Sequence, residues 1–320
     1  MEKICLLLYC SGDTYDISEL VESIKWKGRK GSAARSLSVS LADNANCRSN
    51  INVAEGNQLV FKYGKNELFR GMIMSQQQGS GRKMPVTAYD NGIYLSNNKD
   101  TFIYENKTAH DIFIDVCKRF GIKHSDVAGT AYKIPNLTKS KTTAWDVIQD
   151  ALSQDYKTTG KRHYVMSSKG VLSLVKRQEK ILEYMLESGV NLISYSYKRS
   201  IENIKTRLKI LSDEDTAAAF KKDTSLEKKI GIFQEIEQKD DNLSEAQLGD
   251  YINETLKEIS TPEISLTAEA VGMPEAISGM GIYVRIPDLN ISSKFYIDED
   301  THTFKGGGHT MSLKLNSVNE

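Results

Sequence analysis

The feature that most constrains this chain is the alternation of apolar and polar residues in short segments between turn-forming residues. In RSLSVSLAD (residues 35–43), Leu37, Val39 and Leu41 fall on one side and serines on the other. This period of two is typical of a β-strand with one buried face and cannot form a helical stripe. Several such segments, with turns close together, predict a small antiparallel barrel in the first hundred residues.

Glycine-containing turns between apolar arms predict hairpins. NQLVFKYGKNELFRG (57–71) would turn at residues 64–66, and HYVMSSKGVLSLVKR (163–177) would turn at residues 168–170. Two further strands, GMIMSQQQ (71–78) and MPVTAYD (84–90), would be joined by a turn at residues 79–81.

The pattern becomes helical near residue 106. In NKTAHDIFIDVCKRFGI (106–122), Thr108 can cap a helix, Asp111 lies in its first turn, and Gly121 ends it. One face carries an apolar stripe formed by Ile112, Phe113, Val116, Cys117 and Phe120. A second helix is expected at residues 143–156.

A segment near residues 213–262 carries more acidic than basic side chains and is expected to be a helical insertion. Ser244 and Gln247 form a capping box, and Leu243 and Leu248 can form the hydrophobic staple around it. Pro262 would end this helix.

The predicted fold is therefore α+β and mostly β. It has two small antiparallel barrel-like domains, an intervening α+β domain and a helical insertion. The expected boundaries are residues 1–105 for the first barrel, 106–187 for the α+β domain, and 188–320 for the second barrel, with the insertion at 213–262. Strands such as ISLTAEAV (264–271) and GIYVRI (281–286) support the second barrel.

Charge and cysteine usage exclude several classes of function. The chain has 42 basic and 42 acidic residues, so its formal net charge is zero, which argues against general binding to nucleic acid or anionic membranes. The four cysteines have no metal-ligand spacing. The apolar run near the start is too short for a signal peptide or a membrane span, so we expect folding in a reducing cytoplasm and no stable membrane association.

The stretch FKGGGHTMSLKLNS (304–317) has three candidate interpretations. A phosphate-binding loop needs a helix after its glycines, but the residues after Gly306, Gly307 and Gly308 alternate as a strand. A metal site would use His302 and His309 with Asp298 or Asp300, at irregular spacing. A hairpin turn into the last strand is the interpretation that the alternation favours, with His309 in phase with Met311, Leu313 and Leu315.

No nucleophile motif is present, so an enzyme would have to rely on paired carboxylates. Asp298, Asp300, Glu263 and Glu269 are the candidates for a cell-wall hydrolase, which is the alternative function. A carbohydrate- or protein-binding module is a further alternative. We expect no catalytic, cofactor-binding or metal-binding residues, no cofactor and no enzymatic activity.

Several motifs together resemble those of phage tail baseplate hub proteins, the late-control protein D family and its relatives in Gram-positive prophages and tailocins. The C-terminal part of the resemblance runs through GIYVRI, KFYID and THTFKGGGHTMSLKLN, in which His302, the three glycines and His309-Thr310-Met311 match. FRGMIMSQQ and PVTAYDNGIYLSNNKD match near the N-terminus, and KTAHDIFIDVCKRFGI and TAWDVIQDAL match in the middle. The resemblance covers nearly the whole chain.

The resemblance implies a structural role. Hubs of this family form homotrimers in which each chain supplies two tube domains, so that a pseudo-sixfold ring joins the tail tube to a threefold central spike. It implies as partners the spike, the tail tube proteins, the tape-measure protein and baseplate wedge proteins, with DNA only in transit through the lumen. The chain would assemble in the bacterial host cytoplasm and reside in the baseplate of a virion, a tailocin or another contractile injection system. The acidic insertion is the candidate wedge-facing surface.

Overall fold

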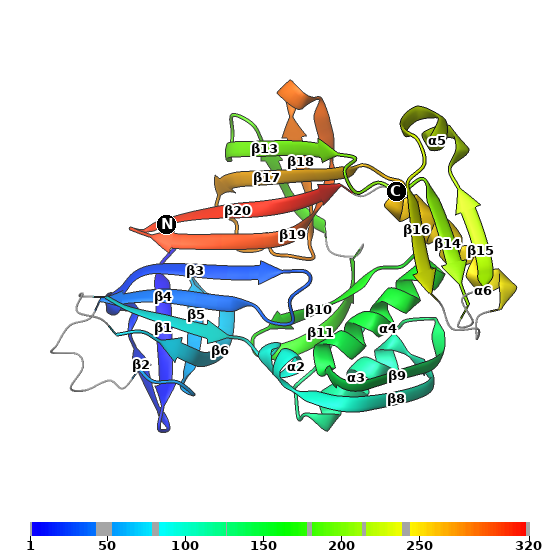
Figure 1. The fold of residues 1–320 in the computed structure, drawn as a ribbon. Helices are drawn as coiled ribbons and strands as arrows, with labels where there is room; N and C mark the ends of the chain where they lie inside the picture. Colours follow the sequence, from blue (N-terminus) through cyan, green and yellow to red (C-terminus); the bar gives the residue numbers. More distant parts are fainter. Residues whose placement is uncertain are drawn as a thin grey trace.

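The fold is α+β and mostly β, as the sequence predicts, and its elements are arranged around one large sheet (Figure 1). The computed structural model describes residues 2–42, 53–78, 83–125, 127–177, 181–212, 216–238 and 244–317. The predicted turn at residues 79–81, Cys47 and the staple residue Leu243 lie outside these ranges.

Among the described residues, thirteen strands form this sheet, in the order β13-β17-β20-β19-β3-β4-β7-β6-β5-β1-β2. Off this path, β18 pairs with β19, and β12 pairs with β18. The N-terminal strands are β1 (Ile4–Cys10), β2 (Asp13–Asp16), β3 (Val21–Arg29), β4 (Ser36–Ala42), β5 (Gln58–Tyr63), β6 (Asn66–Gln76) and β7 (Lys83–Tyr89). The C-terminal strands are β12 (Ile181–Glu187), β13 (Leu192–Ser200), β17 (Glu263–Val271), β18 (Gly281–Ile286), β19 (Ile291–Lys305) and β20 (Gly308–Ser317).

The long strand β19 joins the two strand-rich regions. Its first residues pair with β18, and residues 299–305 pair with β3 on one side and β20 on the other. Each region has its own core: Leu6, Leu37 and Phe61 lie in the first, and Ile282 and Leu313 lie in the second. Phe304 of β19 packs into the first core. The two regions, which the sequence suggests as separate barrels, therefore share a continuous backbone hydrogen-bond ladder.

The stretch 304–317 is a hairpin, as its alternation predicts. β19 ends at Lys305, which pairs with Gly308, so the loop contains only Gly306 and Gly307. Their φ angles are +57° and +79°, the left-handed conformation that a two-residue hairpin turn of type I′ requires at both positions. The glycines are needed for backbone geometry, and the strand that follows excludes a phosphate-binding loop.

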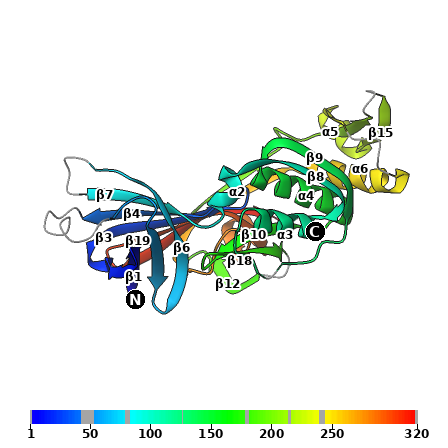
Figure 2. The same cartoon turned by 90° about the horizontal axis from the view of Figure 1, so that it is seen from below.

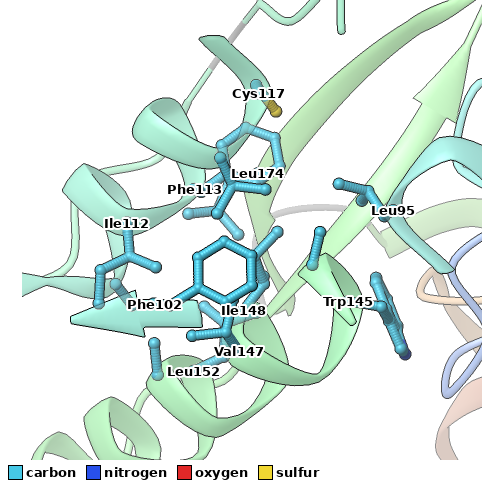
Figure 3. Close-up of a cluster of buried hydrophobic side chains, with 14 of the residues drawn as sticks. Leu95, Phe102, Ile112, Phe113, Cys117, Trp145, Val147, Ile148, Leu152 and Leu174 are labelled. Carbon is cyan, nitrogen blue, oxygen red and sulfur yellow. The ribbon is translucent and has the colours of Figure 1, made fainter. Parts of the chain in front are cut away.

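The middle unit packs two helices against two small sheets. It contains α2 (Ile93–Asn97), β8 (Lys99–Thr108), α3 (Ala109–Arg119), β9 (Lys133–Thr143), α4 (Ala144–Thr159), β10 (His163–Ser168) and β11 (Val171–Lys176). Its core includes Phe113, Ile148 and Leu174 (Figure 3). Thr108 caps α3 as predicted, and the structure adds a reciprocal hydrogen bond from its backbone N–H to Asp111, which completes a capping box. Because Leu95 lies in this core and β8 pairs with β9, we propose a first boundary near residue 92, earlier than the expected residue 105.

The expected helical insertion is a mixed α/β lobe. β14 (Arg207–Leu211) pairs with β15 (Ala217–Lys222) and β16 (Gln234–Gln238), and α5 (Thr224–Ile230) connects β15 to β16. α6 (Glu245–Ile259) has the predicted Ser244–Gln247 capping box and covers Leu208 and Ile210 of β14. The assignment of β14 to the second barrel was therefore wrong, because its apolar face packs against α6.

Seen from below, the N-terminal strands and the lobe lie at opposite ends of the molecule, with the middle unit between them (Figure 2). In the part of the chain that the structure describes, no helix is both long and apolar enough to cross a membrane.

Candidate functional site

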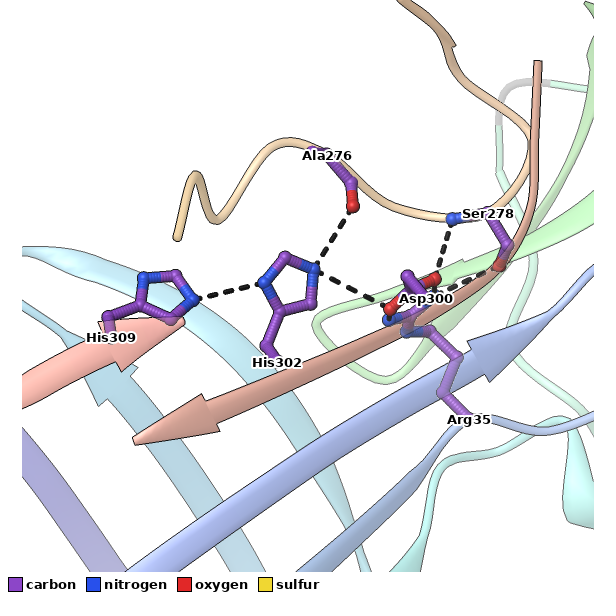
Figure 4. A network of polar contacts seen from close by, with 6 residues as sticks. All are labelled: Arg35, Ala276, Ser278, Asp300, His302 and His309. Carbon is purple, nitrogen blue, oxygen red and sulfur yellow. Dashed lines mark hydrogen bonds and ion pairs between the residues drawn. The ribbon is translucent and has the colours of Figure 1, made fainter. Parts of the chain in front are cut away.

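Three of the residues considered as metal ligands meet where the two halves of the sheet join. Asp300 and His302 lie on β19 and His309 lies on β20 (Figure 4). Arg35 approaches from the segment before β4, and the loop between β17 and β18 covers the group with Ala276 and Ser278. The site is a buried polar junction, because Arg35, Asp300 and His302 are each at most 8% exposed.

Asp300 and Arg35 form the centre of this junction. The Arg35 guanidinium donates from Nη1 to Asp300 Oδ1 at 2.9 Å and from Nη2 to Oδ2, so the ion pair is bidentate. The backbone N–H of Ser278 donates to Asp300 Oδ1 at 2.6 Å, and Arg35 Nη1 also donates to Ser278 Oγ at 3.1 Å. A buried charge pair with this many hydrogen bonds ties the N-terminal half of the sheet to the C-terminal half.

A glycine and a tryptophan of β3 position Arg35. A Cβ atom on Gly28 would lie 1.9 Å from Arg35 Nη1, so only glycine leaves room for the guanidinium. On another side, the Arg35 guanidinium lies 4.3 Å from the ring centroid of Trp26, a cation–π distance. β3 therefore supplies both the space and the aromatic surface that hold Arg35 against Asp300.

The two histidines form one hydrogen-bonded pair whose tautomers follow from their partners. His302 Nε2 lies 3.0 Å from the carbonyl oxygen of Ala276, which can only accept, so this nitrogen carries the proton. His302 Nδ1 is then an acceptor, and His309 Nε2 donates to it at 3.0 Å. The His309 ring stacks on Phe304 with centroids 4.0 Å apart.

Burial keeps both imidazoles neutral. The pKa of His302 is lowered to about 4, chiefly by burial; Asp300 acts in the opposite direction, and Arg35 adds to the lowering. Burial also lowers the pKa of His309 to about 4, with a contribution from His302. The pair is therefore uncharged at neutral pH and serves as a hydrogen-bonded part of the interior.

The geometry does not favour the metal interpretation. His302 and His309 do converge across the hairpin, but both of their facing nitrogens are occupied by the hydrogen bond between them. Asp300 is bound to Arg35. Within the described ranges, no group of three or more His, Cys, Asp or Glu side chains is arranged to hold a metal ion.

The four carboxylates considered for a hydrolase do not gather at one site. Asp298 contacts Arg177, and Glu269 accepts a hydrogen bond from Ser194 Oγ at 3.0 Å. Glu263 and Glu269 lie near opposite ends of β17, about 20 Å apart along the strand. Glycosidase pairs lie about 5–10 Å apart, so these two do not form one. Asp300 is buried in its ion pair with Arg35 and cannot reach a polymer.

Arg35, Trp26, Gly28 and Ser278 were not identified from the sequence. Arg35 is separated from Asp300 by 265 positions in the chain, and no local pattern links them. The one available signal was the acidic run next to His302, which indicates a charge that needs a partner but does not identify that partner.

Comparison with known proteins places this chain in a family. The family model described as YqbQ-like matches residues 24–316, which include Arg35, Asp300, His302 and His309. The chain belongs to the YqbQ-like family. It is 32% identical over 313 residues to YqbQ of Bacillus subtilis strain 168, covering 96% of this chain and 95% of YqbQ. It is also 32% identical over 312 residues to the phage-like element PBSX protein XkdQ of the same strain, covering 96% of both chains.

Solved structures of tail proteins share the fold of this YqbQ-like chain. A 43 kDa tail protein of prophage MuSo2 from Shewanella oneidensis matches with a TM-score of 0.73 at 13% identity, covering 97% of both chains. A tail protein from Neisseria meningitidis MC58 gives 0.73 at 13% identity, covering 98% of this chain and 96% of that one. Prophage tail protein gp18 from Listeria monocytogenes EGD-e gives 0.67 at 11% identity, covering 99% and 95%. The fold is thus shared with these tail proteins.

Proposed function

We propose that this YqbQ-like chain is the structural, non-enzymatic hub of a phage-like tail baseplate, a trimeric ring that joins the sixfold tail tube to the threefold central spike. This proposal rests on one observation. A continuous sheet runs through two β regions, each with its own core, and the pairing of β19 with β3 joins the two regions. A chain with two such regions can present six units from three copies. The fold shared with tail proteins over nearly the whole chain supports the same role.

The described strands offer an edge for self-association. β13 ends the path of paired strands and is an open edge, with unpaired backbone groups on its outer side. Ile193 on this strand is 60% exposed, and Val190 just before it is 72% exposed. Exposed apolar residues on an open strand are typical of a surface covered by another chain. We propose that β13 contacts a second copy in the homotrimer.

The proposed partners are those of a hub. A Francisella complex of PdpA with VgrG contains a chain whose fold this chain matches with a TM-score of 0.56 at 10% identity, over 98% of this chain and 52% of that one. The fold thus occurs in a multi-protein complex, and we propose the central spike as a partner. Tail tube and tape-measure proteins would meet the ring and its lumen, and DNA would only pass through. We propose that the lobe of β14 to α6, at the far end from the N-terminal strands, faces baseplate wedge proteins.

The experiment that tests the proposal is electron microscopy of induced particles from the bacterium that encodes the chain. Gold-labelled antibody against the chain is expected only at the distal end of the tail, and deletion of the gene is expected to stop tail assembly. Complementation with the intact gene is the control. Normal, unlabelled particles in the deletion strain would refute the hub role. A cell-wall turbidity assay with the purified chain tests the hydrolase alternative directly.

A further inference from the structure

A cleft of about 700 Å³ lies between the middle unit, the second β region and the lobe. The turn after β3 contributes Lys30, and Arg162 and Arg177 lie immediately before β10 and after β11. The C-terminal end of α6 and the start of β17 form the opposite side. None of these cations belongs to the Arg35–Asp300 junction.

The two arginines are held side by side with their flat faces covered. The backbone N–H of Arg177 donates to the carbonyl of Arg162 at 2.9 Å, which fixes the two residues as neighbours. The Arg177 guanidinium lies 4.1 Å from the ring centroid of Tyr296, and that of Arg162 lies 3.7 Å from that of Tyr156. Arg162 Nη2 already donates to Glu258 Oε1 at 3.2 Å. The other N–H groups of a guanidinium over a ring can still donate in its own plane, which is the geometry that carboxylates accept.

Among the arginines of the cleft, Arg177 is incompletely paired. The Arg177 side chain is only 10% exposed, its Nε has no hydrogen-bond partner, and its contact with Asp298 is 3.5 Å long. Burial, and then repulsion from Arg177, lowers the pKa of Lys30 to about 8. Burial likewise lowers the pKa of Arg177. A buried guanidinium without full hydrogen bonding costs stability, and an anion in the cleft would remove that cost.

The remaining lining determines which anion fits. Glu254, Glu258 and Glu263 line the same cleft, and their charges would repel a nucleic acid or another polyanion. Ile204, Ile259 and Ile264 add apolar surface beside the cations. A ligand with a single carboxylate next to an apolar side chain matches both the cations and the apolar surface. The carboxylate would pair with the arginines, and the apolar side chain would cover the isoleucines.

We propose that this cleft binds a segment of another protein chain through a glutamate or aspartate carboxylate flanked by an apolar residue. Arg177 and Arg162 would donate to the carboxylate oxygens, and Lys30 would supply the third cation. Binding here is independent of whether the chain resides in a tail, so a negative result would leave the hub proposal standing.

The test is calorimetric titration of the purified chain with two peptides that differ in one group, N-acetyl-Leu-Glu-Leu-amide and N-acetyl-Leu-Gln-Leu-amide. The glutamate peptide is expected to bind at least about tenfold more tightly, since it forms charge-assisted hydrogen bonds that the amide cannot. Inorganic phosphate, titrated separately, is expected to bind more weakly than the glutamate peptide.

Two variants and a control locate the binding. Arg177→Gln is expected to reduce the affinity for the glutamate peptide by about tenfold or more. Arg285→Gln is the matched control, because Arg285 is exposed and pairs with Glu187 outside the cleft. Lys30→Met is expected to weaken binding while raising the thermal midpoint of the ligand-free chain, because it removes a desolvated and repelled cation.

Three results would overturn the proposal: equal affinity for the two peptides, unchanged affinity in both cleft variants, or tighter binding of phosphate than of the glutamate peptide. If Arg177→Gln does not fold, Lys30→Met decides the question alone.

Discussion

At the scale of single residues, the buried histidine pair links the stability of the molecule to pH. His302 and His309 have pKa values near 4 in the folded chain, whereas an unfolded histidine has a pKa of about 6.5. Between these values the unfolded chain binds more protons than the folded one. The free energy of unfolding must therefore fall as the pH falls from about 6.5 towards 4.

We expect His302→Gln to flatten this dependence. His302 alone accounts for a difference on the order of 3 kcal/mol across the window, and glutamine keeps polar atoms in its place without a titrating ring. The measurement is urea denaturation of wild type and variant at pH 7, 5.5 and 4.5. Asp90, whose pKa burial raises to about 6, acts in the opposite direction in both proteins, so the difference between the two proteins isolates the histidine. Parallel curves would contradict the assignment.

Two glycine-to-alanine variants, one of them a control, test the Arg35–Asp300 junction. Gly28→Ala is expected to displace the Arg35 guanidinium, because the new Cβ would lie 1.9 Å from Nη1. Breaking a buried ion pair by displacing one partner costs about 3–5 kcal/mol. Gly31→Ala is the matched control, because a Cβ at Gly31 meets no atom within 4 Å, and its free energy of unfolding should remain close to that of wild type. Equal denaturation midpoints for both variants would rule out this role of Gly28.

At the scale of elements, the two segments that connect the lobe to the rest of the molecule lie next to each other in space. The backbone N–H of Lys205 donates to the carbonyl of Ile259 at 2.8 Å, so the strand that enters the lobe lies beside the helix that leaves it. The lobe has its own small core of Leu208, Ile210, Tyr251, Ile252 and Leu256. Deleting part of the lobe would expose this core to solvent, whereas deleting the whole lobe would remove the core together with the residues that cover it.

Replacing residues 206–259 with a short Gly-Ser linker is therefore expected to leave the remaining chain folded. The removed contacts with the middle unit include the Lys157–Glu237 and Arg162–Glu258 ion pairs, which are partly exposed and contribute about 1 kcal/mol or less each. Circular dichroism and a single cooperative thermal transition would verify the fold. A variant lacking only α6 is the comparison, and we expect it to be less stable than the complete excision. Loss of the cooperative transition on complete excision would refute lobe autonomy.

At the scale of the whole molecule, one charged side chain introduced on β13 tests the proposed contact between copies of the chain. Ile193→Glu on β13 is expected to convert an assembled trimer into monomers, because a buried, unpaired carboxylate at the interface is costly. Ile103→Glu on β8 is the matched control, since Ile103 is 64% exposed and Ile193 is 60% exposed. Light scattering after size-exclusion chromatography reports the mass. A trimer that survives Ile193→Glu as well as Ile103→Glu would exclude β13 from the interface.

The sequence by itself determined the local elements. The alternation in residues 35–43, the Gly306–Gly307 turn and the helix caps at Thr108 and Ser244 all depend on neighbours within a few positions. Side-chain periodicity and turn geometry act over that range, so the mostly β α+β fold could be predicted. The order of the motifs was sufficient for the family resemblance.

Only the tertiary structure decided which elements meet. β14 has the same alternating pattern as the barrel strands but pairs with β15 and β16 in the lobe. β19 could have ended at its own hairpin but also pairs with β3, nearly the whole chain away. An alternating strand specifies that one face is buried but does not specify its partner. The Arg35–Asp300 junction and the cationic cleft both form between segments that are far apart in the sequence. The local pattern of those segments does not specify which of them pack together.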